Sequence, residues 1–328
     1  MCQRIFVIVL CVIPFWGFGQ SHGLPTGLGS VLARFSCLDD SVDKITVYTG
    51  AFGSYTNSAF IGNSKYEATL DFSDYLRIGT FVSIDRRLYR NWTVGFTIPY
   101  MLSSVYRSTS WYPADTYTQS GITEIKLRLG YNQQSRRIKF YTGVATDLPL
   151  QKGRRAFTSP TISIGNDAFW AFGADAGIIG SISTKLKAFS SVELNLYVPK
   201  NGSLVEGGQA MILSSDSVQS IQAQIGLRSW ASINVGFVLK SHNFDYSLAY
   251  ELYAETADNI KQIIPAGFLE QTATLETMKG KPAWNHNLNI GLSTSIEGIR
   301  LGIVAKAAVA GHGTFDEKIV LLIAGFSL

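Results

Sequence analysis

The sequence has 328 residues, of which 46% are hydrophobic and 16% are charged, and its formal net charge is +4 at pH 7. In soluble exported domains about a quarter of the residues are charged, so the lower charged fraction here argues against that class. The sequence has no long basic run, which argues against a nucleic-acid partner.

The first 19 residues have the pattern of a secretory signal peptide. Arg4 supplies a positive charge, an apolar run extends from Ile5 to Trp16, and Gly17-Phe18-Gly19 forms a small-x-small cleavage site. The run is shorter than the roughly 20 apolar residues that a transmembrane helix needs. We therefore expect residues 1–19 to be removed on export.

Most of the remaining sequence alternates between apolar and polar residues with a period of two. In residues 92–102, for example, Trp92, Val94 and Phe96 alternate with Thr93 and Gly95. The same alternation recurs in residues 121–131, 186–196, 244–252, 288–292 and 301–306. Such alternation predicts β-strands with one apolar face, which suits either a β-sandwich or a β-barrel.

The lengths of the connections distinguish these two folds. The expected strands are residues 43–55, 65–85, 92–106, 120–131, 137–148, 167–181, 185–198, 217–239, 244–254, 284–296, 299–310 and 317–328. Connections after even-numbered strands are short, whereas those after odd-numbered strands are long, apart from residues 311–316. Outer-membrane barrels have this asymmetry, with short periplasmic turns and longer extracellular loops.

We therefore predict an all-β fold: a transmembrane antiparallel β-barrel of about twelve strands, or up to fourteen if residues 65–85 and 217–239 are each broken. The expected organisation is a signal peptide (1–19), an N-terminal periplasmic or plug segment (20–42) and an outer-membrane barrel (43–328). The expected location is the outer membrane of a Gram-negative bacterium. Its lipid and lipopolysaccharide are then the expected surroundings of the barrel.

The last strand ends in an aromatic-x-hydrophobic pattern at Phe326-Ser327-Leu328. This pattern resembles the C-terminal signal by which the barrel-assembly machinery recognises outer-membrane proteins. Aromatic residues are also expected to form two interfacial girdles. We place Trp92, Tyr131, Phe244 and Phe326 in the periplasmic girdle, and Tyr100, Trp170, Tyr197, Tyr250 and Trp284 in the outer girdle.

A search for catalytic residues finds little support for an enzyme. Of the four histidines, only His286 falls on an expected strand, and Leu288 stands where a barrel phospholipase would carry its serine. No Cys, His or carboxylate cluster has the spacing of metal ligands, so we expect no metal and no cofactor. A hydrolase remains the weaker alternative.

Charged residues on the polar faces of the strands are the candidate functional residues. Inside a barrel, such charges must meet water or charged partners. The candidates that we expect to face the lumen are Arg77, Glu124, Lys126, Arg128, Asp175, Lys187, Glu193, Arg228, Asp245, Glu251, Arg300 and Lys306. They could form a polar eyelet that guides solutes, or structural ion pairs that fill the barrel.

Residues 255–283 form the longest expected outer loop. Its residues 256–268 have helical character, because Ile260, Ile263 and Ile264 share one helix face and Pro265-Ala266-Gly267 would end the helix. This segment could cover the mouth of the barrel, or it could be a surface loop.

Three short motifs resemble a known family. They are Ile98-Pro99-Tyr100, the strand from Gly121 to Leu127, and Leu148-Pro149-Leu150 with Gly153 after it. Together they are similar to the outer-membrane channels of phenol and other aromatic-degradation pathways, which are distant relatives of long-chain fatty-acid transporters. The resemblance covers mainly residues 76–180, and it departs from the family pattern at Glu124 and Leu150.

The resemblance implies a transporter-like barrel but carries over no binding residues. With the charged lumen, it leads us to expect passive uptake of small, in part hydrophobic, solutes through a narrow polar lumen. The alternative is a structural or surface-recognition barrel that acts through its long outer loops.

Overall fold

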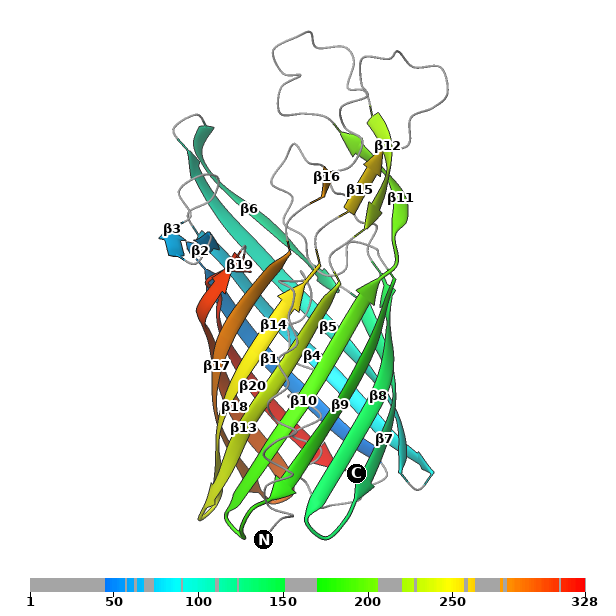
Figure 1. Ribbon diagram of the computed structural model, residues 1–328, viewed down its shortest axis with the longest axis vertical. Coiled ribbons are helices and arrows are strands. Elements are labelled where there is room, and N and C mark those ends of the chain that lie inside the picture. Colours follow the sequence, from blue (N-terminus) through cyan, green and yellow to red (C-terminus); the bar gives the residue numbers. More distant parts are fainter. Residues whose placement is uncertain are drawn as a thin grey trace.

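A computed structural model shows a closed antiparallel β-barrel, with short turns at one end and longer excursions at the other (Figure 1). It describes residues 45–56, 58–61, 64–67, 74–89, 91–109, 112–122, 124–150, 170–205, 220–226, 229–256, 259–262, 278–279, 282–312 and 314–327. The expected signal peptide and the segment 20–42 lie outside these residues. Among the described residues, no helix is long and apolar enough to cross a membrane.

Twelve strands of the described chain form the barrel. They are β1 (Ile45–Thr56), β4 (Asp74–Tyr89), β5 (Trp92–Thr109), β7 (Glu124–Gln134), β8 (Ile138–Pro149), β9 (Ala171–Ser181), β10 (Leu186–Tyr197), β13 (Trp230–Ser241), β14 (Phe244–Glu255), β17 (Ala283–Ile296), β18 (Ile299–His312) and β20 (Lys318–Ser327). Strand β20 pairs with β1, β1 with β4, and β4 with β5, so the sheet closes on itself. Because the sheet is closed, it has no free edge whose backbone N–H and C=O groups would lack hydrogen-bond partners in the lipid. The predicted all-β barrel and its approximate strand count are confirmed.

One further strand, β6 (Tyr112–Ile122), continues the main sheet beyond the barrel rim. Strand β5 pairs with β7 as far as Thr97↔Lys126 and then with β6 from Tyr100↔Ile122, so the register shifts by one residue between them. Pro99 lies at this shift, where a residue without an N–H group is tolerated. Residues 107–119 were expected to be a loop, and that expectation is wrong, because β5 and β6 pair across most of them.

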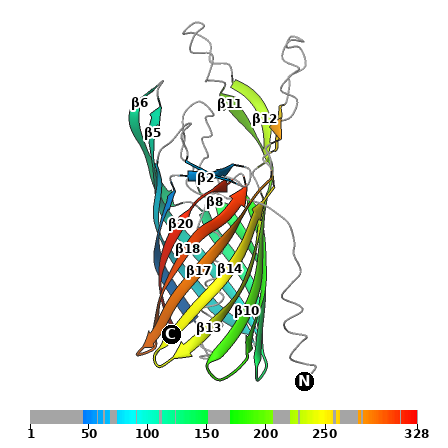
Figure 2. The same ribbon diagram turned by 60° about the vertical axis from the view of Figure 1, so that its left-hand side comes forward.

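The other outer excursions also carry strands. Strands β2 (Ser58–Ile61), β3 (Ser64–Glu67) and β19 (Thr314–Phe315) form one small sheet. Strands β11 (Lys200–Val205), β12 (Ser220–Gly226), β15 (Asn259–Gln262) and β16 (Met278–Lys279) form another, which rises beyond the barrel (Figures 1 and 2). The helix expected over residues 256–268 is therefore wrong where β15 lies. The long strands expected at 65–85 and 217–239 are both broken.

The short turns lie together at the opposite end (Figure 1). Among them, His242-Asn243 and Glu297-Gly298 have two residues each. Glu297 and Gly298 both have positive φ, at 49° and 82°. This conformation belongs to the type I′ turn, whose twist matches that of the flanking strands and for which glycine is favoured. The predicted asymmetry of the connections is therefore confirmed.

Exposure alternates along the strands, as the sequence pattern predicts. The outward residues form what we call the apolar belt, which includes Leu248, Ile290 and Leu322 with 52%, 57% and 52% exposed. Trp92, Tyr100, Trp170 and Tyr250 are exposed in the same way, but Tyr197 is 8% exposed and lies on the inner face. Its assignment to the outer girdle is wrong.

Candidate functional site

The inner face of the barrel consists of the buried residues that alternate with the apolar belt. Most of the predicted lumen residues lie there in ion pairs with partners on nearby strands. Arg228 lies outside the described residues. Lys187 is half-buried near the turn end of β10 and shares the inward parity of Phe189 and Glu193.

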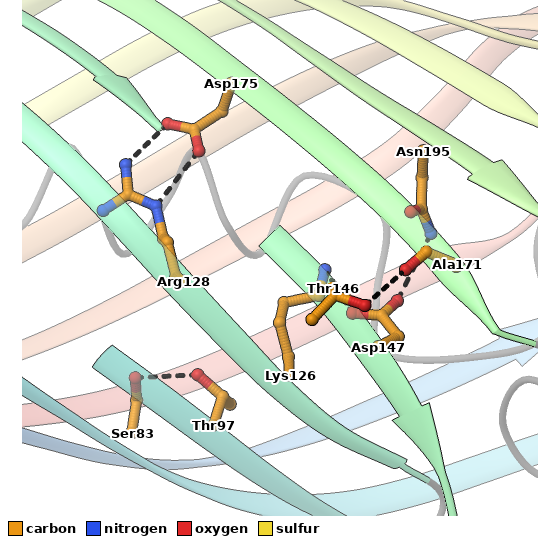
Figure 3. Close-up of polar contacts among 9 residues, drawn as sticks. All are labelled: Ser83, Thr97, Lys126, Arg128, Thr146, Asp147, Ala171, Asp175 and Asn195. Carbon is orange, nitrogen blue, oxygen red and sulfur yellow. Dashed lines mark hydrogen bonds and ion pairs between the residues drawn. The ribbon is translucent and has the colours of Figure 1, made fainter. Parts of the chain in front are cut away.

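Lys126 and Asp147 form a pair between β7 and β8, with Nζ 3.7 Å from Oδ1 (Figure 3). Asn195 in β10 donates from Nδ2 to Oδ2 of Asp147 over 3.4 Å. Asp147 and Asn195 are each 3% exposed. Three strands thus contribute to one polar contact on the inner face.

Arg128 and Asp175 form a bidentate pair between β7 and β9 (Figure 3). Arg128 donates from Nε to Oδ1 over 3.0 Å and from Nη2 to Oδ2 over 2.7 Å. Two parallel hydrogen bonds to a carboxylate are the strongest common form of ion pair. Glu193 in β10 is the register partner of Asp175 and is 7% exposed, which places a second carboxylate beside this pair.

A second group of pairs joins β18 to β14. Arg300 donates from Nη2 to Oδ2 of Asp245 over 2.9 Å, near the turn end. Lys306 pairs with Glu251, which also accepts a hydrogen bond from Nδ2 of Asn287 over 3.2 Å. Glu251 is 1% exposed, so its charge depends on these partners.

Arg77 in β4 pairs with Glu317, which lies in the outer turn before β20. Arg77 also donates from Nε to Oγ of Ser54 over 3.1 Å. Burial acts to raise the pKa of the Glu317 carboxyl, but the charge of Arg77, hydrogen bonds with Ser54 and Arg77, and the charge of Lys306 together hold this pKa below its usual value. Glu317 is therefore a carboxylate that the fold keeps ionised.

Five inner ion pairs join strands, or a strand and the turn beside one, that are adjacent or one strand apart in the sheet. This holds for Arg77 with Glu317, Lys126 with Asp147, Arg128 with Asp175, Arg300 with Asp245 and Lys306 with Glu251. The charges are thus neutralised along the wall, and none of these pairs spans the barrel.

The inner face also carries two apolar clusters that sequence reasoning missed. One consists of Tyr48, Phe52, Phe81, Met101, Leu321 and Ile323. The other consists of Tyr141, Ile179, Phe189, Val238 and Ala249. The inner wall is therefore not wholly polar, although the sequence pattern leads us to expect a polar wall. It contains apolar side chains as well as ion pairs.

Glycines on neighbouring strands make room for the inner aromatic rings. A Cβ atom at Gly79 would lie 2.4 Å from Cζ of Phe52, and one at Gly177 would lie 2.3 Å from Cζ of Tyr141. The glycines and the aromatic residues are visible in the sequence. Which glycine lies beside which ring depends on the strand register, and the sequence pattern alone does not give the register.

His286, the residue considered for catalysis, lies at the outer rim. Its Nδ1 forms a hydrogen bond with the hydroxyl group of Tyr250, and Trp284 packs edge-on against its ring at a centroid distance of 4.9 Å. Trp284 also stacks on His312 at 6.3 Å. In the described part of the chain, this arrangement is an aromatic cluster at the barrel rim.

Comparison with known proteins supports the fold. No protein-family model and no curated protein sequence matches the chain. Among solved structures, an outer membrane channel from Pseudomonas putida F1 superimposes with a TM-score of 0.59 and 13% identity, covering 88% of this chain and 96% of that one.

Two other structures are less similar. A mutant of TodX, a monoaromatic hydrocarbon channel, has a TM-score of 0.48 and 10% identity, covering 94% of this chain and 96% of that one. The transport unit of the autotransporter AIDA-I from Escherichia coli has a TM-score of 0.45 and 10% identity, covering 92% and 98%. These two similarities are too low to bear on function. The first match and the apolar belt show that the chain has the fold of an outer-membrane β-barrel.

Proposed function

We propose that the protein is an outer-membrane channel for the passive uptake of small solutes, hydrophobic ones among them. The observation that carries this proposal is the course of the inner ion pairs, which follow the wall and join strands at most one apart. Barrels of about 8 strands are filled by side chains and those of about 16 have open aqueous channels, so twelve strands suit a narrow bore. The wall around this bore contains apolar side chains of the two clusters as well as charged ones.

Liposome swelling tests the proposal. Purified, folded protein is reconstituted and challenged with neutral solutes of increasing size, and with polar and apolar solutes of matched size. We expect swelling rates above those of liposomes with heat-denatured protein, falling with solute size. Rates equal to the denatured control, with protein that is folded, would contradict the channel function.

We also propose that lipopolysaccharide surrounds the outer rim and that the barrel-assembly machinery recognises β20. The outward residues of β20 support the second part, because Val320, Leu322 and Phe326 form one exposed apolar row that leads to the end of the chain. The signal peptide (1–19) and the periplasmic or plug segment (20–42) remain predictions. Replacing Phe326 with Asp should lower the amount of assembled barrel in cells without changing its synthesis.

A surface-recognition function is a second candidate, favoured by the sheet of β11, β12, β15 and β16 beyond the barrel. Deleting residues 257–281 separates the two candidates. If the outer sheet is the functional part, deletion abolishes ligand or cell binding while solute permeation stays unchanged.

A further inference from the structure

Four basic side chains lie on consecutive strands at the turn end of the barrel, the end that faces the periplasm in outer-membrane barrels. Arg137 directly precedes β8, Lys185 directly precedes β10, Lys187 is the second residue of β10, and Lys240 lies at the end of β13. In the sheet, β8, β9, β10 and β13 follow one another. Arg137, Lys185 and Lys240 are exposed, and Lys187 is half-buried. We call these four residues the cationic rim.

Backbone hydrogen bonds hold the residues of the cationic rim beside one another. The N–H group of Lys240 donates to the carbonyl oxygen of Lys185 over 2.7 Å, and that of Ser181 donates to the carbonyl oxygen of Arg137 over 2.8 Å. Ser181 is also the register partner of Lys187, so it lies between Arg137 and Lys187. Residues paired across neighbouring strands put their side chains on the same face, with Cβ atoms about 4.5–5.5 Å apart.

The strand parity directs these side chains toward the bore. Val238 in β13 and Phe189 in β10 are buried on the inner face, with 5% and 3% exposed. Lys240 comes two residues after Val238, and Lys187 comes two residues before Phe189, so both share the inward parity. The backbone pairings extend this parity to the other two residues of the cationic rim.

In the part of the chain that the structure describes, none of the four residues of the cationic rim forms an ion pair. Among the carboxylates at this end, Asp245 is the register partner of Lys240, but Arg300 donates to it over 2.9 Å. Glu297 lies in the turn between β17 and β18, and Asp85 lies on β4, which β5 and β7 separate from β8. The cationic rim therefore keeps a net positive charge.

Lys185 and Lys240 are like charges placed opposite each other, an arrangement that destabilises a sheet, yet a backbone hydrogen bond fixes them there. Clustered positive charge raises the local concentration of anions, and rings of Arg or Lys make pores selective for anions. We propose that the cationic rim makes the bore selective for small anions, carboxylates among them, over small cations. This inference rests on the proposed channel function and names the class of solute that its periplasmic mouth favours.

The reversal potential in a planar bilayer with unequal KCl concentrations tests this selectivity. Near about 0.1 M salt the Debye length is about 10 Å, so fixed charges at the mouth act on the passing ions. Chloride should be preferred to potassium, and the triple variant Lys185→Gln/Lys187→Gln/Lys240→Gln should lower the chloride-to-potassium permeability ratio several-fold.

Arg86→Gln is the matched control, because it removes an exposed cation at the same end of the barrel but on the opposite face of the wall. The register partner of Arg86 is Val94, which is 39% exposed on the outward face. This substitution should leave the permeability ratio unchanged. Conduction without preference for chloride, or a preference that the triple variant retains, would overturn the proposed selectivity and leave the channel function standing.

A second test does not depend on conduction. Ser181→Cys, in protein whose native cysteines are replaced with serine, puts a thiol between Arg137 and Lys187. Its reaction rates are compared for two reagents, the anionic sulfonatoethyl methanethiosulfonate and the cationic trimethylammonioethyl methanethiosulfonate. Both react with the same thiolate, so the ratio of their rates, divided by the ratio for 2-mercaptoethanol, reports the electrostatic potential at the cationic rim.

We expect this ratio to favour the anionic reagent, to fall several-fold in the triple lysine variant and to stay unchanged in Arg86→Gln. The expected ratio in folded protein that does not conduct would support the attraction of anions by the cationic rim and contradict the channel function. A ratio equal to that of 2-mercaptoethanol, or one that the triple variant does not change, would overturn the proposal whether or not the protein conducts.

Discussion

Arg128 in β7 and Asp175 in β9 bond to each other across the intervening strand β8, directly over Gly143. A Cβ atom at Gly143 would lie 2.8 Å from Nη2 of Arg128 and 2.8 Å from Oδ1 of Asp175. Gly143 is the register partner of Asp175, so the absence of a side chain there is what lets the two charges meet. The ion pair and the glycine therefore form one structural unit.

Gly143→Ala is expected to destabilise the barrel by about 1–3 kcal/mol, because the added methyl group must displace the Arg128–Asp175 pair. Urea unfolding in detergent or lipid, followed by tryptophan fluorescence, measures this change. Gly180→Ala in β9 is the control, since a Cβ atom there meets nothing within 4 Å. Equal effects of the two substitutions would show that the close approach at Gly143 is unimportant.

Arg128→Met is expected to cost about 3 kcal/mol, because it leaves the carboxylate of Asp175 inside the barrel without its bidentate partner. The double variant Arg128→Met/Asp175→Leu should recover most of this loss, since it removes both charges together. A double-mutant cycle on unfolding free energies gives the coupling between the two residues. Strictly additive losses would contradict a direct interaction.

Glu317 should make the stability of the barrel sensitive to acid. Its pKa is lowered in the folded protein, so the pair with Arg77 stabilises the fold above the ordinary value of 4.5 and is lost as the pH falls through the lower folded value. The unmodified protein should exceed Glu317→Gln in unfolding free energy at pH 7, and the difference should shrink below pH 4.5. A difference that stays constant down to pH 3, a value about 1.5 units lower, would argue against the ion pair.

Leu248→Arg tests the orientation of the wall, because Leu248 is 52% exposed on the outward face of β14. An arginine facing lipid near the midplane costs about 2–4 kcal/mol. We expect a corresponding loss of folding free energy into liposomes. Asn243→Arg, in the neighbouring turn, should change it little. If Leu248→Arg is neutral, the apolar belt does not face lipid.

The barrel is predictable from the sequence because each of its strands requires a regular alternation of apolar and polar residues, and this alternation is visible within a short segment. Each strand must put apolar residues such as Leu248 and Leu322 toward lipid and polar residues toward the interior, and this pattern is visible without knowing which strands pair. Strand count and turn asymmetry follow from the same pattern. In the structure, Lys126, Arg128 and Asp175 form ion pairs on the inner face.

The partners of these residues were not predictable, because they depend on register between distant segments. Asp147 shares its face with Tyr141 and Gly143, which hides the polar character of that side of β8. The inner aromatic residue Phe52 likewise packs over Gly79 of the neighbouring strand β4, a relationship that depends on the strand register. In the segment that forms β15, Ile260 fits the periodicity of a helix as well as that of a strand, and the pairing of Ile260 with Ile225 of β12 decides between them.

Single-channel recording tests the central claim that the barrel is a passage through the membrane. Folded protein in a planar bilayer should give discrete conductance steps that heat-denatured protein does not give. A bilayer that contains folded barrel, shown by its heat-dependent electrophoretic mobility, and that stays silent would contradict the channel function.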